Sequence, residues 1–128
     1  ENVAPAPLED RLRAHPFASQ AVIVGDQRPF IAALVTIDED EFVQWVRETG
    51  LAATTVAESA ASAELRAVIR VAVDAANASV SRAESIREFA ILPRDLTIEA
   101  DELTPTLKVR RSIVLGRYAA AIESIYGT

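Results

Sequence analysis

The order of hydrophobic and polar residues predicts a short helix near the start of this 128-residue chain. Leu8 and Leu12 are four positions apart, so they share one face of a helix. Pro7 suits the first helical position, and Pro16 stops the helix. Residues 1–7 are expected to be extended, because prolines are excluded from a helix interior.

Two apolar runs follow and predict a pair of strands. They are residues 21–24 and 30–37, and the turn-forming pair Gly25-Asp26 follows the first of them. Runs of this kind on either side of a short turn predict a hairpin. Both faces of the hairpin are nearly all apolar, so we expect helices to cover it.

Capping signals predict where the next helices begin. Asp38 and Glu41 have the spacing of a capping box, and the helix behind them is predicted to end at Gly50. Thr55 and Glu58 repeat the same spacing.

The second half of the chain completes a mixed α/β pattern. The longest predicted helix covers residues 63–80, and a third strand is predicted at 89–92. An acidic turn at 99–102 leads into a loop, and an amphipathic helix is predicted over 112–126. This order of elements predicts an α/β (α+β) fold, a small sandwich of a short mixed sheet with helices packed on it.

Composition narrows the possible functions. Hydrophobic residues make up 50% of the chain and charged residues 25%, as in ordinary soluble domains. The absence of cysteine excludes disulfides, thiolate metal sites and cysteine nucleophiles. A net charge of −6 argues against nucleic-acid binding, and no apolar run approaches the ~18–20 residues of a transmembrane helix. The first residues include neither Met nor a signal-peptide pattern, so we expect a piece of a larger protein.

Several residues that could carry chemistry have simpler interpretations. The single histidine, His15, excludes a multi-histidine metal site, and its place beside Pro16 favours a capping or surface role. The acidic clusters at 38–41 and 99–102 could attract a cation, but helix capping explains the first and a solvated turn the second. We therefore predict no metal site.

Three further residues on predicted helices are also assigned structural roles. Asn77 and Ser79 lie near the end of the longest predicted helix, where an exposed or terminal position is favoured over catalysis. Trp45 is expected in the core or at a domain contact, with no second aromatic residue beside it to form a stacking platform.

Lys108 is the candidate catalytic residue. It is the only lysine among 13 basic residues, and it follows Thr-Pro-Thr-Leu in a loop. Arg110 and Arg111 follow it, which predicts a cationic tip on an acidic chain. A loop lysine is ordinarily just solvated. However, a compact ammonium suits phosphate or carboxylate oxygens where charge develops, and the planar guanidinium of arginine has a different geometry.

The sequence LTPTLKVRR at 103–111, followed by an amphipathic helix, resembles the last core motif of the adenylate-forming enzymes. These are the acyl-CoA synthetases, the adenylation domains of peptide synthetases and the luciferases. In that superfamily a lysine in this loop is followed by a hydrophobic residue and a basic pair, as in residues 108–111. Thr106 and Leu107 stand where Ser-Gly is usual, a departure that resembles the long-chain fatty-acyl-CoA ligase branch.

The resemblance extends along nearly the whole chain. Residues 1–12 resemble the end of the motif that follows the hinge of these enzymes, with Pro7 where glutamate is usual. Residues 15–35 resemble the next helix end and hairpin, and 63–80 resemble an insertion common in the long-chain branch. The residues that match the motif after the hinge are Val3, Pro5 and Glu9.

The resemblance implies that residues 1–128 form a single C-terminal domain of an AMP-forming long-chain fatty-acid–CoA ligase. The N-terminal domain, which would bind ATP and the fatty acid, is absent from this sequence and would be the partner of this one. The enzyme would activate a fatty acid with ATP to an acyl-adenylate and transfer the acyl group to coenzyme A. Lys108 would stabilise the charge of the adenylation step, and the domain would rotate between the two half-reactions.

The resemblance also implies cofactors and a location. ATP, coenzyme A and Mg²⁺ would serve the full-length enzyme, and none is expected to bind tightly to this domain alone, which we expect to be inactive. The location implied is cytoplasmic, or peripheral to a membrane in the full-length enzyme.

Two alternatives remain open from the residues. The chain could be a non-catalytic α/β binding or regulatory module whose basic tip, residues 108–111, docks an acidic partner. It could also self-associate through its alanine-rich helix.

Overall fold

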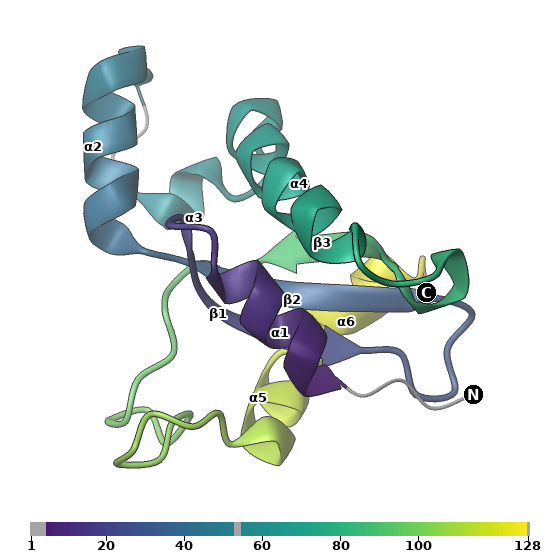
Figure 1. The fold of residues 1–128 in the computed structure, drawn as a ribbon. Coiled ribbons are helices and arrows are strands. Elements are labelled where there is room, and N and C mark those ends of the chain that lie inside the picture. Colours follow the sequence, from purple (N-terminus) through teal and green to yellow (C-terminus); the bar gives the residue numbers. More distant parts are fainter. Residues whose placement is uncertain (1–4, 53–54, 128) are drawn as a thin grey trace. The chain divides into compact units, whose positions relative to one another are not determined.

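The computed structural model describes residues 5–52 and 55–127, so Val3 of the predicted motif lies outside the described residues. The chain divides into two compact units, Glu1–Asp95 and Leu96–Thr128. The first unit contains a sheet and most of the helices, and the second contains the lysine loop and two short helices (Figure 1). Within the described ranges, no helix is long and apolar enough to cross a membrane.

The first unit is organised around a three-stranded mixed sheet in the order β1-β2-β3. Strand β1 (Ala18–Val24) pairs antiparallel with β2 (Ile31–Ile37), which confirms the predicted hairpin. Strand β3 (Ile86–Ile91) pairs parallel with β2 on its other side. Both outer strands begin three residues before their predicted starts, and β1 contains an irregularity in register between Ala18 and Ala21.

Two helices pack together beside this sheet. Helix α1 (Pro5–Arg13) contacts β1, and it also contacts α4 (Ala63–Asn77) (Figure 1). The prediction that residues up to Pro7 are extended is wrong from Pro5 onward. Both prolines lie in the first turn of α1, where a backbone N–H has no partner within the helix and proline is tolerated.

The core lies between the sheet and these helices. All seven residues of β2 are buried, as expected for a strand that is apolar on both faces. One cluster joins alternate residues of β2 to leucine and isoleucine side chains of the two helices. Its members on β2, α1 and α4 include Ile31, Ala33, Val35, Ile37, Leu8, Leu12, Leu65 and Ile69.

Side-chain caps start the remaining helices of the first unit. The Asp38 carboxylate accepts a hydrogen bond from the Glu41 backbone N–H at 3.0 Å and begins α2 (Glu39–Thr49). That helix ends at Gly50, whose φ of 70° is left-handed. Thr55 and Glu58 form a complete capping box around α3 (Val56–Ser59). A short 3₁₀ turn, Arg82–Glu84, precedes β3 and was not predicted.

The second unit begins with turns and ends with two short helices. The predicted helix over 112–126 is wrong as a single element, because it is divided into α5 (Arg111–Arg117) and α6 (Ala119–Ile125). Tyr118 separates them with φ −106° and ψ 26°. Gly116, a poor helix former, lies in the last turn of α5. Backbone hydrogen bonds still run from Tyr118 N–H to the Val114 carbonyl, so the division is a local distortion.

Candidate functional site

The Lys108 loop is a tight hairpin closed by backbone hydrogen bonds. Leu103 and Val109 form an antiparallel bridge at its base. Within it, the Thr104 N–H donates to the Lys108 carbonyl and the Leu107 N–H donates to the Thr104 carbonyl, both at 2.8 Å. This is the pattern of a three-residue hairpin loop that ends in a left-handed residue. Pro105 takes the second position of the turn, which suits its fixed φ.

The Thr104 side chain makes the loop tighter still. Its Oγ1 accepts a hydrogen bond from the Lys108 N–H at 3.1 Å and lies 3.1 Å from Oγ1 of Thr106. Both threonines of the Thr-Pro-Thr sequence therefore contribute to the geometry immediately before the lysine.

Leu107 holds the left-handed position of this loop. Its φ is 66°, a conformation that glycine adopts freely and leucine adopts at a cost of about 1–2 kcal/mol. Leu107 is 57% exposed, so less than half of its surface is available for contacts that could offset the strain. Leu107 is one of the two residues in which the sequence departs from the usual Ser-Gly, and the structure keeps the glycine-like backbone in spite of the substitution.

Glu102 lies at the base of the loop and is fully buried, with 0% of its surface exposed. Its carboxylate accepts a hydrogen bond from the Thr97 N–H at 3.2 Å. Its backbone N–H donates to the Thr97 carbonyl at 3.0 Å, and its carbonyl accepts from the Arg110 N–H at 2.8 Å. Side chain and backbone of this single residue therefore connect the preceding turn to the end of the loop.

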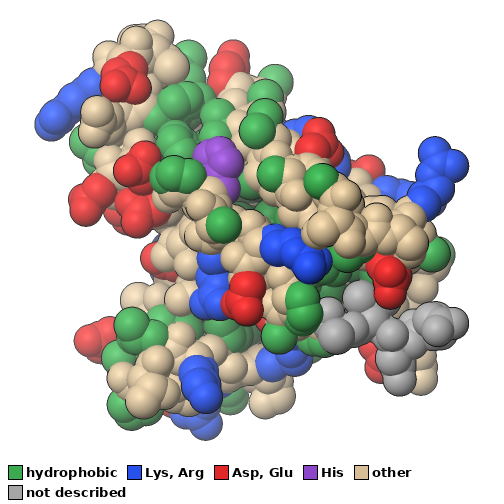
Figure 2. All heavy atoms as spheres, viewed as in Figure 1, with side chains coloured by type: hydrophobic (Ala, Val, Ile, Leu, Met, Phe, Trp, Pro, Cys, Tyr) green, Lys and Arg blue, Asp and Glu red, His purple; other side chains and the backbone are tan. Residues whose placement is uncertain are grey.

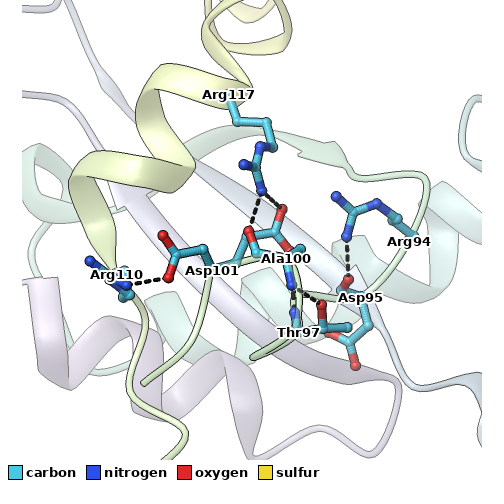
Figure 3. Close-up of polar contacts among 8 residues, drawn as sticks. Arg94, Asp95, Thr97, Ala100, Asp101, Arg110 and Arg117 are labelled. Atoms are coloured by element: carbon cyan, nitrogen blue, oxygen red, sulfur yellow. Dashed lines mark hydrogen bonds and ion pairs between the residues drawn. The ribbon is translucent and has the colours of Figure 1, made fainter. Parts of the chain in front are cut away.

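Arg117, in the last turn of α5, neutralises this buried carboxylate. Its Nη1 atom donates to Oε2 of Glu102 at 2.9 Å and to the Ala100 carbonyl at 2.7 Å. Figure 3 shows the Arg117 guanidinium pointing from the helix toward the turn that contains Ala100. A buried carboxylate without such a partner would carry a large desolvation cost.

A second ion pair lies at the surface of the same unit. Arg110 pairs with Asp101, and both side chains are largely exposed (Figure 3). Asp101 has a φ of 67°, which aspartate tolerates better than most residues. The predicted cationic tip is therefore smaller than its sequence suggests, because the charge of Arg110 is compensated.

Lys108 itself is exposed at the end of this framework. Its backbone N–H and carbonyl are both bonded to Thr104, and within the described part of the chain its ammonium has no ion-pair partner. The arrangement thus fixes the backbone of a lysine while leaving its charge available. Elsewhere, the face drawn in Figure 2 mixes acidic and basic side chains.

The other residues considered from sequence have structural contacts. His15 Nδ1 accepts a hydrogen bond from the Phe17 N–H at 3.1 Å, a local turn contact consistent with the capping role. The Asn77 side chain bonds both the N–H and the carbonyl of Ile86, at 2.8 and 2.9 Å, and so joins the end of α4 to the start of β3. Ser79 is exposed.

Two of the sequence interpretations were wrong in detail. Trp45 does have aromatic neighbours, because the ring of Phe17 lies edge-on at 5.8 Å and that of Phe42 at 6.0 Å. The 99–102 cluster is not simply a solvated turn, since Glu102 is buried. Among the described residues, no group of three His, Cys, Asp or Glu side chains is arranged to hold a metal ion.

Glu102 and Arg117 are the residues that the sequence interpretation missed. They are fifteen positions apart, so no helical or strand period connects them. One signal was present: Arg117 lies four positions after Ile113, on the predicted apolar face of the last helix. An arginine on such a face points to a buried acidic partner.

Comparison with known sequences identifies relatives along the whole chain. The family model described as AMP-binding enzyme C-terminal domain matches residues 1–128. The long-chain-fatty-acid–CoA ligase FadD15 of Mycobacterium tuberculosis is 54% identical over 127 residues, which are 98% of this chain and 21% of that protein. The long-chain-fatty-acid–CoA ligase ACSBG2 of Gallus gallus is 33% identical and matches 98% of this chain and 19% of its own length. The chain therefore spans about a fifth of the curated relatives that it matches.

Solved structures share the fold at lower identity. The didomain of a carboxylic acid reductase from Segniliparus rugosus, in complex with AMP, superposes with a TM-score of 0.75 at 21% identity. That match covers 97% of this chain and 16% of the other. A Mycobacterium tuberculosis fatty acyl CoA synthetase gives a TM-score of 0.53 at 17% identity, over 94% of this chain and 19% of the other. These likenesses show a shared fold, and the family match over residues 1–128 places the chain in the AMP-binding enzyme C-terminal domain family.

Proposed function

We propose that residues 1–128 form the C-terminal domain of a longer AMP-forming fatty-acid–CoA ligase, in which Lys108 stabilises the adenylation step. The observation that carries this proposal is the Lys108 loop. Three hydrogen bonds fix its backbone: two join Thr104 to Lys108, and one joins Thr104 to Leu107. The Lys108 side chain stays exposed. The 54% identity to a long-chain-fatty-acid–CoA ligase supports the substrate class.

The chemistry of adenylation explains why such a lysine is useful. A fatty-carboxylate oxygen forms a bond to the α-phosphorus of ATP, while the bond from that phosphorus to pyrophosphate breaks. Both reactants are anions, so a cation placed where charge develops lowers the barrier. Lysine is a compact point charge that approaches an oxygen from many directions, whereas an arginine fork favours paired oxygens in one plane.

We also propose that Lys108 acts only in the first half-reaction. In the second, the thiol of coenzyme A loses its proton and forms a C–S bond to the acyl carbon, while the bond from that carbon to the AMP oxygen breaks; no bond to phosphorus changes. Rotation of this domain against the N-terminal domain would withdraw the lysine and expose a different face to the thiol. The N-terminal domain, which we propose binds ATP and the fatty acid, is thus the principal partner of this chain.

ATP and coenzyme A enter this proposal as substrates, and Mg²⁺ as the counter-ion of ATP. When bound, Mg²⁺ supplies positive charge at the phosphates. The described residues contain no acidic or histidine cluster suited to hold the ion, so no residue of this chain is assigned to it.

The test compares two half-reactions in the full-length protein that contains this chain. Pyrophosphate release is measured with ATP, Mg²⁺ and palmitate, and thioester formation is measured separately from preformed palmitoyl-adenylate and coenzyme A. We expect Lys108→Ala to lower the first rate about 100–1000-fold, the usual cost of losing one positioned charge, and to leave the second nearly unchanged. The side chain is exposed, so the substitution should not unfold the domain.

Two further variants sharpen this test. Arg82→Ala removes one exposed cation from the 3₁₀ turn of the first unit and should leave both rates unchanged. Lys108→Arg keeps the charge but changes its geometry and should recover only part of the lost rate. Equal losses in both half-reactions for Lys108→Ala would exclude the proposed role. No adenylation by the folded wild-type protein with any carboxylate would favour the binding module instead.

A further inference from the structure

The buried charge of Glu102 is the feature that the proposed function does not explain. Burying a carboxylate such as that of Glu102 costs free energy, and even a paired one often contributes no more to stability than apolar residues of similar volume. The exposed Arg110–Asp101 pair lies in the same turn region and needs no such burial. The Glu102 carboxylate is fully buried and is paired with a partly exposed Arg117, whereas the neighbouring pair lies at the surface. This burial suggests that Glu102 holds the atoms around it in fixed positions.

The contacts of Glu102 show that it holds the Lys108 loop in place. Glu102 directly precedes Leu103, the first residue of the Leu103–Val109 bridge. Its carbonyl accepts a hydrogen bond from the N–H of Arg110, which directly follows Val109. The side chain meanwhile holds the Thr97 N–H and the guanidinium of Arg117. One residue thus joins the turn before the loop, both ends of the loop and the helix that follows.

We propose that Glu102, held by Arg117, is a positioning residue that sets the place of the Lys108 ammonium for adenylation. Lys108 lies two positions inside the Glu102–Arg110 hydrogen bond, so a shift of the Glu102 backbone moves the lysine with it. Displacements of about 1 Å at a reacting group can cost on the order of 100-fold in rate. The inference rests on the proposed function of Lys108 and adds to it two residues that do not touch substrate.

The test uses Glu102→Gln in the full-length protein, beside Glu99→Gln as a matched control. Both changes replace a carboxylate by an amide in the same acidic turn, but Glu99 is exposed. Glutamine can still accept a hydrogen bond from Thr97, whereas its amide cannot neutralise Arg117. We expect Glu102→Gln to lower the kcat of palmitate adenylation about 10–100-fold with little change in KM. Thioester formation from palmitoyl-adenylate should persist, and Glu99→Gln should behave as wild type.

Substitutions of Arg117 provide an independent test and a rescue. Arg117→Ala removes the guanidinium that is bonded to the buried carboxylate, so it should lose adenylation at least as strongly as Glu102→Gln. Arg117→Lys restores a cation on a side chain one bond shorter and should recover part of the adenylation rate. A merely structural role predicts parallel losses in both half-reactions and no selective recovery. If thermal melts show that Glu102→Gln does not fold, Arg117→Lys and Arg117→Ala are compared instead. Higher adenylation by Arg117→Lys would support the positioning role, and equal adenylation by the two variants would exclude it.

The outcomes separate this inference from the proposed function. If Lys108→Ala abolishes adenylation while Glu102→Gln matches Glu99→Gln, the positioning role is excluded and the function of Lys108 stands. The positioning role is also excluded if Glu102→Gln slows both half-reactions equally. If Lys108→Ala itself leaves adenylation intact, the proposed function of Lys108 is excluded, and the positioning role of Glu102 is excluded with it.

Discussion

Strand β2 and the Lys108 loop are held in place by opposite means. All seven residues of β2 are buried, and the strand is paired on both sides by β1 and β3. The loop has one bridge at its base, a strained and exposed Leu107, and an exposed lysine beside it. Its rigidity depends on a few polar contacts that converge on Glu102 and Thr104.

This difference distinguishes contacts that stabilise the fold from contacts that hold a reacting group in position. Apolar burial is favourable but non-directional, so it holds the sheet together without requiring any one atom at a defined place. Hydrogen bonds and ion pairs add less net stability, yet they fix distances and directions. A group that must meet a substrate oxygen is therefore better supported by the second kind of contact. Substitutions in the two regions should differ accordingly.

The largest expected effect on stability is in the sheet unit. Ile69→Ala removes a fully buried side chain of α4 from the main cluster and should lower the free energy of unfolding by about 2–5 kcal/mol. Urea denaturation followed by Trp45 fluorescence would measure it. Val71→Ala on the same helix is the control. Because Val71 is 60% exposed, this substitution should change the free energy of unfolding by less than about 0.5 kcal/mol. Similar losses for both would contradict the assignment of stability to burial.

An intermediate effect is expected where a polar contact supports the same unit. Asn77→Ala removes the acceptor of the buried Ile86 N–H and the donor to its carbonyl. The unmade hydrogen bonds should cost about 1–3 kcal/mol in the same denaturation experiment. Ser79→Ala, two residues later and exposed, should have almost no effect. If the two variants were equally stable, the Asn77 contacts would not connect α4 to β3 energetically.

The smallest effect should have the opposite sign and lies in the loop. Leu107→Gly relieves a left-handed leucine but adds freedom to the unfolded chain, for a net gain of about 0.5–1 kcal/mol. Thr106 has no positive φ, and its hydroxyl contacts that of Thr104, so Thr106→Gly should instead lower the free energy of unfolding by at least about 0.5–1 kcal/mol. Thermal denaturation followed by circular dichroism compares them. A loss of stability in Leu107→Gly would show that the leucine side chain makes a contact worth more than its strain.

Much of the first unit could be predicted because its signals are local. The Asp38 and Thr55 caps depend on residues three positions ahead, and the hairpin depends on two neighbouring apolar runs. The prediction that Trp45 stands alone failed in part for the opposite reason, because Phe17 reaches it from the turn before β1. Its other neighbour, Phe42, lies three positions earlier on α2 itself, so that contact was a local signal that the sequence interpretation overlooked. The prediction of one helix over 112–126 was wrong at Tyr118. The apolar spacing continues past this residue, but the helical backbone is interrupted there.

In the candidate site, the sequence by itself determined that Lys108 lies in a loop after Thr-Pro-Thr and that a helix follows. Proline chemistry and hydrophobic period act over a few residues, so they can be read from neighbours alone. Only the tertiary structure decided that Glu102 is buried, that Arg117 neutralises it from fifteen positions away, and that Leu107 takes a left-handed backbone. Burial and pairing depend on which distant segments meet when the chain folds, and a linear pattern does not contain that information.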